Sequence, residues 1–229
     1  MDRLLRLPSP DLPLMPLALA MAARTRGGLP LRIVKVGAYA GHVGDYLRQF
    51  LEQEENVQAV LAEPDPVNFD NLTTNLGEMP GVVLVRAAVG SEEGAGIFHT
   101  VRTEGRWASS PLAGQLGSLT KEHLLRHGVQ EEEILSIPIR VITLSSLLSL
   151  GGMDSADMLV VDAEGADHGI VMDALTLDEP PPLLCFEHRH MREEEVESVF
   201  GKLRSLGYRW THDRFDTLAL RFGGVEATR

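Results

Sequence analysis

Four short apolar segments constrain the fold of this chain more than any other feature of its sequence. They are rich in valine, isoleucine and leucine, and they are LRIVKVGAY (31–39), VQAVLAEPD (57–65), GVVLVRAAVG (81–90) and DMLVVDAEG (157–165). None shows the strict alternation of a strand with one wet face, which indicates strands that are buried on both faces. Helical patterns separate several of them, at 45–55, 67–78 and 142–150. Strands that alternate with helices predict a doubly wound α/β fold with a mostly parallel sheet.

The last part of the chain predicts a fifth strand, a helix and an antiparallel end to the sheet. The strand is PLLCFEH (182–188), and the charged helix that follows spans 192–207, with Gly207 as its C-terminal stop. The tail at 208–222 predicts two strands joined at Asp213-Arg214, which form a closing hairpin.

The length of 229 residues fits one domain with one substantial core. We expect the main domain over 31–229 and an N-terminal helical segment over 1–30. Its helix is expected to begin after Pro16, to end near Gly27-Gly28 and to lie over the active site as a lid. The segment also resembles a secretory signal, but prolines interrupt it and it is shorter than the about 20 apolar residues that span a bilayer, so we expect no membrane association.

A long segment from about 97 to 133 interrupts the pattern of strands and helices. It contains glycines, serines, Trp107 and a short helix at 120–128. Excursions of this length in a compact domain are usually lids or binding loops, so we expect substrate recognition there.

Charge and cysteine content argue against several classes of function. The formal net charge is -12 at pH 7, which opposes binding to a phosphate backbone, so we expect no nucleic-acid partner. The single cysteine, Cys185, lies in an apolar run, where it is expected to pack as a small hydrophobe rather than act as a nucleophile. Without a disulfide framework, the chain fits a reducing cytoplasm.

A glycine-rich turn follows the first predicted strand, at the edge where open α/β sheets bind their ligands. It runs from Gly37 through Gly41 to Gly44 in the spacing G-x-x-x-G-x-x-G and leads into a helix. Glycine lets backbone amides approach a ligand closely. The spacing does not match the G-x-G-x-x-G fingerprint of nicotinamide dinucleotide sites. Glu63 ends the second strand, where its carboxylate can accept both hydroxyl hydrogens of a ribose that lies over the turn.

A series of segments resembles, in order and spacing, the consecutive motifs of FkbM methyltransferases and covers about residues 33–208. The segments are VGAYAG, AEPDPVNFDNLTTNL, RAAVGSEEG, IPIRVITLSSLL, VVDAEGAD, and LLCFEH followed by LRSLGY. The most specific pair is E-P-x-P after the second strand with D-x-E-G-A after the middle strand. The resemblance implies a seven-stranded, Rossmann-like sheet of the class I methyltransferases that binds S-adenosyl-L-methionine and transfers its methyl group.

The resemblance also implies roles for individual residues. Gly37 and Gly41 are expected beneath the methionine part of the cofactor, Glu63 at the ribose, and Ala87 and Ala88 near the adenine. The full set expected to bind the cofactor is Gly37, Tyr39, Gly41, Glu63, Pro64, Asp65, Ala87, Ala88, Ser109, Ser110 and Asp162. The two serines match a serine in the family's insertion.

Two residues depart from the family pattern. Lys35 stands where the family usually has aspartate, and Tyr39 stands where it usually has asparagine. An ammonium group near a sulfonium cation is unfavourable unless a carboxylate offsets it or the lysine points away. Tyr39 can instead lay its ring beside the cofactor or the substrate.

Acids and histidines follow the middle and fifth strands and are expected at the same edge. Methyl transfer is an in-line displacement, so the protein mainly supplies proximity, alignment and, for a protonated acceptor, a base. We expect Asp162 and Glu164 to position the acceptor and remove its proton, while another acid caps the following helix. Glu187, His188 and His190 end the fifth strand, and the first two are further catalytic candidates. We expect no metal, although convergence of Asp162, Glu187 and His188 on a divalent cation is an alternative.

We therefore expect methyl transfer from S-adenosyl-L-methionine to an oxygen of a small molecule, sugar or secondary metabolite that binds at 97–133. N-methylation of a peptide or amine in natural-product biosynthesis is the main variant, since an acid-rich mouth suits a cationic or peptide-like acceptor. A non-catalytic binding or partner subunit with the same fold is a second alternative. A nicotinamide-dependent oxidoreductase is a third and weaker one. The acceptor is the expected partner, with a homodimer as a further option.

Overall fold

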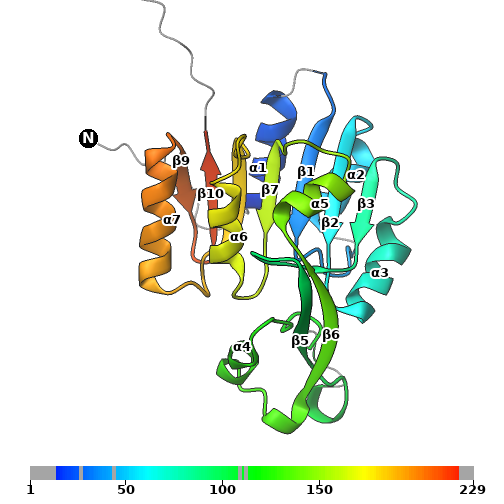
Figure 1. Ribbon diagram of the computed structural model, residues 1–229. Coiled ribbons are helices and arrows are strands. Elements are labelled where there is room, and N and C mark those ends of the chain that lie inside the picture. Colours follow the sequence, from blue (N-terminus) through cyan, green and yellow to red (C-terminus); the bar gives the residue numbers. More distant parts are fainter. Residues whose placement is uncertain (1–13, 26–27, 43–44, 108–109, 111–112, 222–229) are drawn as a thin grey trace, which may run out of the picture.

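The computed structural model describes residues 14–25, 28–42, 45–107, 110 and 113–221 (Figure 1). Within this part of the chain, seven strands form one sheet in the order β3-β2-β1-β7-β8-β10-β9. Their bounds are β1 (Leu31–Val36), β2 (Val57–Ala62), β3 (Val82–Val85), β7 (Met158–Val161), β8 (Leu183–Glu187), β9 (Arg209–His212) and β10 (Asp216–Leu220). All neighbours pair in parallel except β10, which is antiparallel to both β8 and β9. The structure confirms the predicted fold class with its antiparallel C-terminal hairpin.

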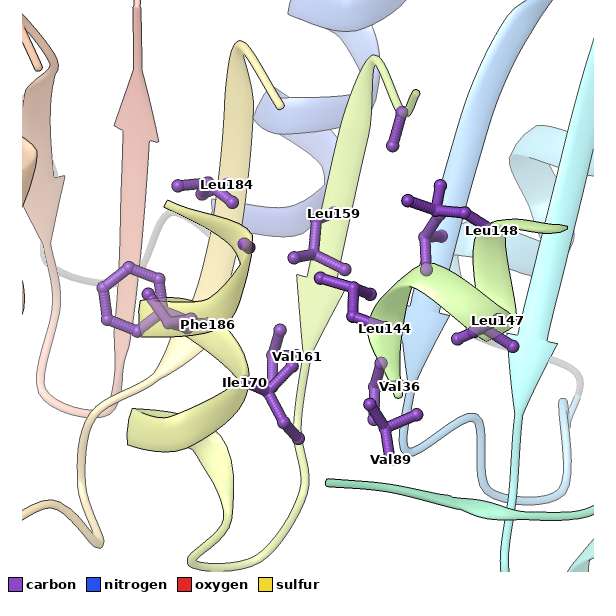
Figure 2. Packing of buried hydrophobic residues seen from close by; sticks show 14 of the residues in the cluster. Val36, Val89, Leu144, Leu147, Leu148, Leu159, Val161, Ile170, Leu184 and Phe186 are labelled. Atoms are coloured by element: carbon purple, nitrogen blue, oxygen red, sulfur yellow. The ribbon is translucent and has the colours of Figure 1, made fainter. Parts of the chain in front are cut away.

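Helices cover both faces of this sheet (Figure 1). One face carries α1 (Leu14–Thr25), α2 (Tyr46–Gln53) and α3 (Pro66–Leu76), and the other carries α5 (Leu144–Leu150), α6 (Asp167–Ala174) and α7 (Glu193–Ser205). Ile33 and Met158 point into the first layer. Val36, Val161 and Phe186 point into the second, which Figure 2 shows from close by. Because both faces are covered, the central strands β7 and β8 are buried over almost their whole length and do not alternate.

Side chains at the ends of strands set where several helices begin. Asp45, Asp65 and Thr143 each accept a hydrogen bond from a backbone amide in the first turn of α2, α3 and α5, respectively. These caps satisfy amides that have no partner within the helix. At the other end of α7, Gly207 has a φ of +80° and terminates the helix as predicted.

The N-terminal helix differs in start and place from the expectation. α1 begins at Leu14, before Pro16 rather than after it, because a proline in the first turn removes an N–H that has no helical partner. The helix packs against α2, β8 and β10, and none of its described residues lines the pocket described below. Its place is therefore the sheet face rather than the active site. No helix within the described part of the chain is long and apolar enough to cross a bilayer.

The third apolar segment divides between two sheets, which the sequence pattern did not indicate. β3 ends at Val85, and the next strand, β4 (Ala88–Val89), pairs with β6 (Ile134–Ile142), which also pairs with β5 (Gly94–Val101). The segment expected at 97–133 is therefore framed by a hairpin of two strands, and we call residues 94–142 the insertion. Pro138 lies in a part of β6 that pairs with β5 alone, which is where strands tolerate proline.

The insertion extends beyond the carboxyl ends of β1, β2 and β7 (Figure 1). Between its two strands it contains η1 (Gly105–Trp107), α4 (Lys121–Arg126) and η2 (Glu131–Glu133). It has a small apolar cluster of its own, against which Trp107 packs, made of Val101, Ala113, Leu116, Leu124, Val129 and Ile134. This cluster gives the insertion a defined shape next to the edge of the sheet where ligands are expected.

Candidate active site

A pocket of about 350 Å³ lies between the carboxyl ends of β1, β2 and β7 and the insertion. This volume is within the range of about 300 to 1,000 Å³ that is usual for small-ligand sites. Several residues expected from the sequence line it, namely Gly37, Tyr39, Glu63, Pro64, Ala87, Ala88, Asp162 and Glu164. Others in the lining were not expected, namely Asp45, Asn68, Phe98, Gly114, Gln115, Gly117 and Leu119.

Gly37 brings the turn after β1 into close contact with the loop after β7. Its φ is +77°, and a Cβ atom at this position would lie 1.6 Å from the carbonyl oxygen of Asp162. No side chain fits there, and the backbone conformation itself favours glycine. The floor of the pocket therefore depends on this residue being glycine.

Glu63 ties the glycine turn to the end of β2. One carboxylate oxygen accepts a hydrogen bond from the Tyr39 amide at 2.8 Å, and the other accepts one from the Asp65 amide at 3.0 Å. The residue is 5% exposed, and burial raises the pKa of Glu63 to about 7 against the lowering effect of these two amides. Tyr39 adopts a φ of +52°, which places its amide toward the carboxylate. The Asn68 side chain also interacts with this carboxylate and lowers its pKa, and the lone pairs that remain are available to a ligand.

Lys35 lines the pocket, but its charge is paired. Its ammonium nitrogen lies 3.2 Å from a carboxylate oxygen of Asp45, which also caps α2. The Lys35 side chain is only 12% exposed, so this ion pair is partly shielded from water. The neighbouring carboxylate thus offsets the positive charge that departs from the family pattern.

Small apolar residues form another wall of the pocket. Ala87 is fully buried, Ala88 is 5% exposed, and Pro64 and Phe98 lie in the same lining. Asn68 on α3 donates a hydrogen bond from its side-chain amide to the carbonyl of Gly114 at 2.8 Å, which fixes the insertion against this wall. The sequence feature that could have identified Asn68 is its position as a polar residue in the first turn of a helix that starts at the edge of the sheet where ligands bind.

Three described residues of the expected cofactor set, Gly41, Asp65 and Ser110, do not line the pocket. Gly41 faces α3, since a Cβ atom there would lie 2.9 Å from Leu72, and Asp65 is 6% exposed and caps α3. Their positions serve the turn and the helix start rather than a ligand contact. Ser110 lies in a turn of the insertion, where its amide donates to the carbonyl of Trp107, and Ser109 lies outside the described residues.

The loop after β7 brings two acids with different environments to the pocket. Asp162 is exposed to the open pocket and surrounded by protein on its other sides. Desolvation by the surrounding protein raises the pKa of Asp162 to about 7, and the nearby charge of Glu164 is the second cause of this rise. Asp167 is 1% exposed and accepts hydrogen bonds from the amides of Ala163 at 2.9 Å and Gly165 at 3.0 Å. Asp167 therefore takes the structural role expected for one acid, from the first residue of α6 rather than from the cap position.

Glu164 connects this loop to the insertion. Its φ is +47°, and its carboxylate oxygen lies 2.9 Å from Nε2 of His123, although the two groups are not aligned as a hydrogen bond. The hydroxyl of Ser118 donates to the Glu164 carbonyl at 2.8 Å. Two segments of the insertion thus contact this one residue.

Neither Glu187, the last residue of β8, nor His188, which follows it, is among the residues that line the pocket, and the two side chains contact different partners. His188 Nδ1 lies 3.0 Å from the Thr217 hydroxyl of β10, away from the pocket. Burial raises the pKa of Glu187 to about 8, and the nearby charge of Asp162 is the second cause of this rise. A carboxylate oxygen of Glu187 lies 3.4 Å from Nε2 of His190. Asp162, Glu187 and His188 form no metal-binding group among the described residues.

Comparisons with known proteins agree with this geometry. The METTL16 MTase domain has a TM-score of 0.51 at 12% identity, covers 96% of this chain and 71% of that chain, and shows a shared fold. The precorrin-6y C5,15-methyltransferase of Geobacter metallireducens has a TM-score of 0.46 at 10% identity, and the match covers 90% of this chain and 86% of that chain. The human METTL16 N-terminal domain in complex with SAH has a TM-score of 0.47 at 12% identity, and the match covers 92% of this chain and 69% of that chain. A comparison with curated proteins finds no match. The model of the Methyltransferase FkbM domain matches residues 35–210, which include the glycine turn, Glu63 and the acids after β7, and the chain therefore belongs to the FkbM family of methyltransferases.

Proposed function

We propose that this protein transfers a methyl group from S-adenosyl-L-methionine to an oxygen atom of a small-molecule acceptor. One observation carries the proposal. The same pocket holds the buried carboxylate of Glu63 beside the glycine turn and the carboxylate of Asp162, to which no described residue donates a hydrogen bond. The first suits a ribose and the second suits an acceptor hydroxyl.

The residues present fit this cofactor. The free lone pairs of Glu63 can accept the two ribose hydroxyl hydrogens, and charge-assisted hydrogen bonds of this kind are the strong ones. The wall of Pro64, Ala87, Ala88 and Phe98 offers an apolar surface for a flat adenine ring. When bound, the cofactor supplies a methyl group that is activated by its sulfonium charge.

The charge of the lining also suits a cationic cofactor. Lys35 and Asp45 pair with one another, which leaves Glu63, Asp162 and Glu164 as the remaining acidic groups in the lining. Carboxylates near a sulfonium stabilise it, and they do so more strongly in a partly buried pocket than in water. The departure at Lys35 is therefore compatible with binding.

We assign the role of proton acceptor to Asp162 rather than to Glu164. Among the described residues, no group donates a hydrogen bond to the Asp162 carboxylate, whereas the Glu164 carboxylate faces His123. Asp162 takes the proton from the acceptor hydroxyl as that oxygen acquires the methyl group. Glu164 holds the loop and the insertion in register around the acceptor.

A second candidate is methylation of an amine or peptide-like nitrogen. Glu164 raises the pKa of Asp162, and Asp162 and Glu164 both raise that of Glu187, so the three acids lie close together, and such a group attracts a cationic acceptor. The oxygen acceptor remains the first proposal because a free carboxylate is a suitable base for a hydroxyl.

The test begins with isothermal titration of the full chain with S-adenosyl-L-methionine, S-adenosylhomocysteine and NADH. We expect binding of the first two and none of NADH. Labelled methyl transfer to matched hydroxyl and amine acceptors then separates oxygen from nitrogen chemistry. No measurable affinity for the first two ligands would support a non-catalytic subunit and overturn the proposal.

A further inference from the structure

A cluster of histidines and acids joins the insertion to the loops after β7 and β8. We call it the histidine cluster, and it consists of two groups that share His190, one with His123 and His127 and the other with Glu164 and Glu187. The ring centres of the histidines lie 4.5 Å, 4.7 Å and 5.2 Å from one another. Two of the rings come from α4 and its C-terminal cap, and the third follows β8, so the cluster spans segments that are far apart in the sequence.

Buried polar atoms in this cluster have no hydrogen-bond partner among the described residues. They are both ring nitrogens of His123, which is fully buried, and one carboxylate oxygen of Glu187. Buried polar side chains are hydrogen-bonded in the great majority of cases, and an exception calls for a bound ion or water. A cation between these groups would satisfy them.

His127 is oriented to present a lone pair. Its Nδ1 lies 2.9 Å from the backbone carbonyl of His123, so Nδ1 carries the proton that is donated to this acceptor. The other ring nitrogen, Nε2, is then unprotonated in the neutral ring and can bind a metal. A second hydrogen bond to a carbonyl is the usual way in which proteins orient a metal-binding histidine.

The spacing of the donor atoms matches a tetrahedral ion. Zinc bonds of about 2.0 to 2.1 Å place the ligand atoms of a tetrahedron about 3.3 Å apart. A Glu164 oxygen lies 2.9 Å from Nε2 of His123 and 3.5 Å from Nε2 of His190. The donor atoms of His123, His127 and His190 all lie within 4.8 Å of one another, and Glu164 contacts two of these three rings, so the four side chains would have to close further around a bound ion.

The charge of the cluster also favours a cation. The carboxylate of Glu164 faces His123 and His190 and has no lysine or arginine ion pair in the described part of the chain. A divalent ion would add positive charge beside this carboxylate.

We propose that His123, His127, His190 and Glu164 bind one divalent transition-metal ion of the Zn²⁺ class, which clamps the insertion to the core beside the pocket. Imidazole nitrogens suit zinc and its neighbours, whereas magnesium and calcium prefer oxygen ligands. Four protein ligands make a closed site, which is the pattern of structural rather than catalytic zinc. Glu187 lies within reach as a further oxygen donor next to His190.

The test uses the full chain after dialysis against a chelator, with Zn²⁺ alone as the probe and a chromophoric chelator as the competitor. We expect one equivalent to bind in the nanomolar range, as structural sites do. His127→Gln and His190→Gln should each weaken this binding at least 100-fold, and His99→Gln, outside the cluster but in the same insertion, should not. Circular dichroism without metal checks that the variants fold. Binding that is weak, or equally tight in all variants, overturns the proposal.

Hydrogen exchange with and without Zn²⁺ tests the clamp itself. Protection of α4 and of the loop at 162–167 should rise with the metal in the wild type and stay unchanged in His127→Gln. Equal protection in the wild type with and without Zn²⁺ would mean that His123 and Glu164 are merely an ion pair, which overturns the clamp. No cofactor is present in these experiments, so their outcome is independent of the proposed methyl transfer.

Discussion

The strongest single test of the cofactor pocket is Glu63→Ala. The substitution removes the two hydrogen bonds that we propose Glu63 makes to the ribose, and a hydrogen bond to a charged group contributes about 1.5 to 3 kcal/mol. Both together predict that the affinity for S-adenosyl-L-methionine falls at least 100-fold, since each 1.4 kcal/mol is tenfold. The affinity of Glu63→Gln should lie between those of the wild type and Glu63→Ala, because glutamine keeps an acceptor oxygen but loses the charge.

The same substitution has two opposed effects on stability. It leaves the buried amides of Tyr39 and Asp65 without their acceptor, at a cost of roughly 1 to 3 kcal/mol each. It also removes a carboxylate whose pKa rises from 4.5 to about 7 in the folded protein, and that rise opposes the ionised form by about 3 kcal/mol. The two effects largely cancel above pH 7. We therefore expect a folded variant whose unfolding free energy lies within about 3 kcal/mol of the wild type.

Isothermal titration with S-adenosyl-L-methionine measures the affinity, and urea unfolding measures the stability. Glu197→Ala, on the exposed face of α7, is the matched control and should change neither. Loss of affinity in an unfolded variant would say nothing of the ribose, so the comparison is made only where the unfolding transition shows a folded protein. A folded Glu63→Ala protein with wild-type affinity would refute the assignment of Glu63 to the cofactor.

Three further predictions follow from the structure. Asp162→Asn should lower the rate constant of methyl transfer by a factor of about 10² to 10⁴ and leave the cofactor affinity nearly unchanged, because a base acts in the transition state. A single-turnover assay measures this rate constant, and Glu197→Gln is the control variant. Gly37→Ala should lower the unfolding free energy by about 2 to 4 kcal/mol or prevent folding, since its Cβ would meet the Asp162 carbonyl. The control Gly201→Ala, inside α7, should raise the unfolding free energy slightly. The third concerns pH. Between pH 4.5 and about 7 the folded state holds a proton on Glu63 that the unfolded state has released, so stability should fall by about 3 kcal/mol as pH rises through this window. Urea unfolding across this range should show a smaller fall for Glu63→Ala, and equal slopes in both proteins would contradict the raised pKa.

Local sequence patterns were sufficient for the sheet and for the first contacts of the pocket. A strand buried on both faces lacks the regular alternation of polar and apolar residues, and β1, β2, β7 and β8 each lack it. Gly37 and Glu63 could be assigned to the pocket because the carboxyl ends of neighbouring parallel strands meet at one edge. The antiparallel hairpin followed from turn residues at Asp213-Arg214 between two short strands.

The insertion was harder because its strands are half exposed and irregular in sequence. β6 carries a proline and mixes exposed and buried residues, so its pattern did not distinguish a strand from a loop. The change of sheet after Val85 also left no local signal, since Ala88 and Val89 are as apolar as the strand before them. Only pairing with a distant segment shows where such a strand belongs.

The chemistry at the pocket mouth depended on tertiary structure for the same reason. His123 and His190 lie 67 positions apart along the chain, and no local pattern relates them, yet their rings are in contact. Glu187 and His188 are adjacent in the sequence, but the two side chains contact different partners. The sequence by itself determined which strands are buried and which residues end them, because burial on both faces leaves a local record. Which side chains meet was decided by the packing of the insertion against the core, because contacts between distant segments leave none.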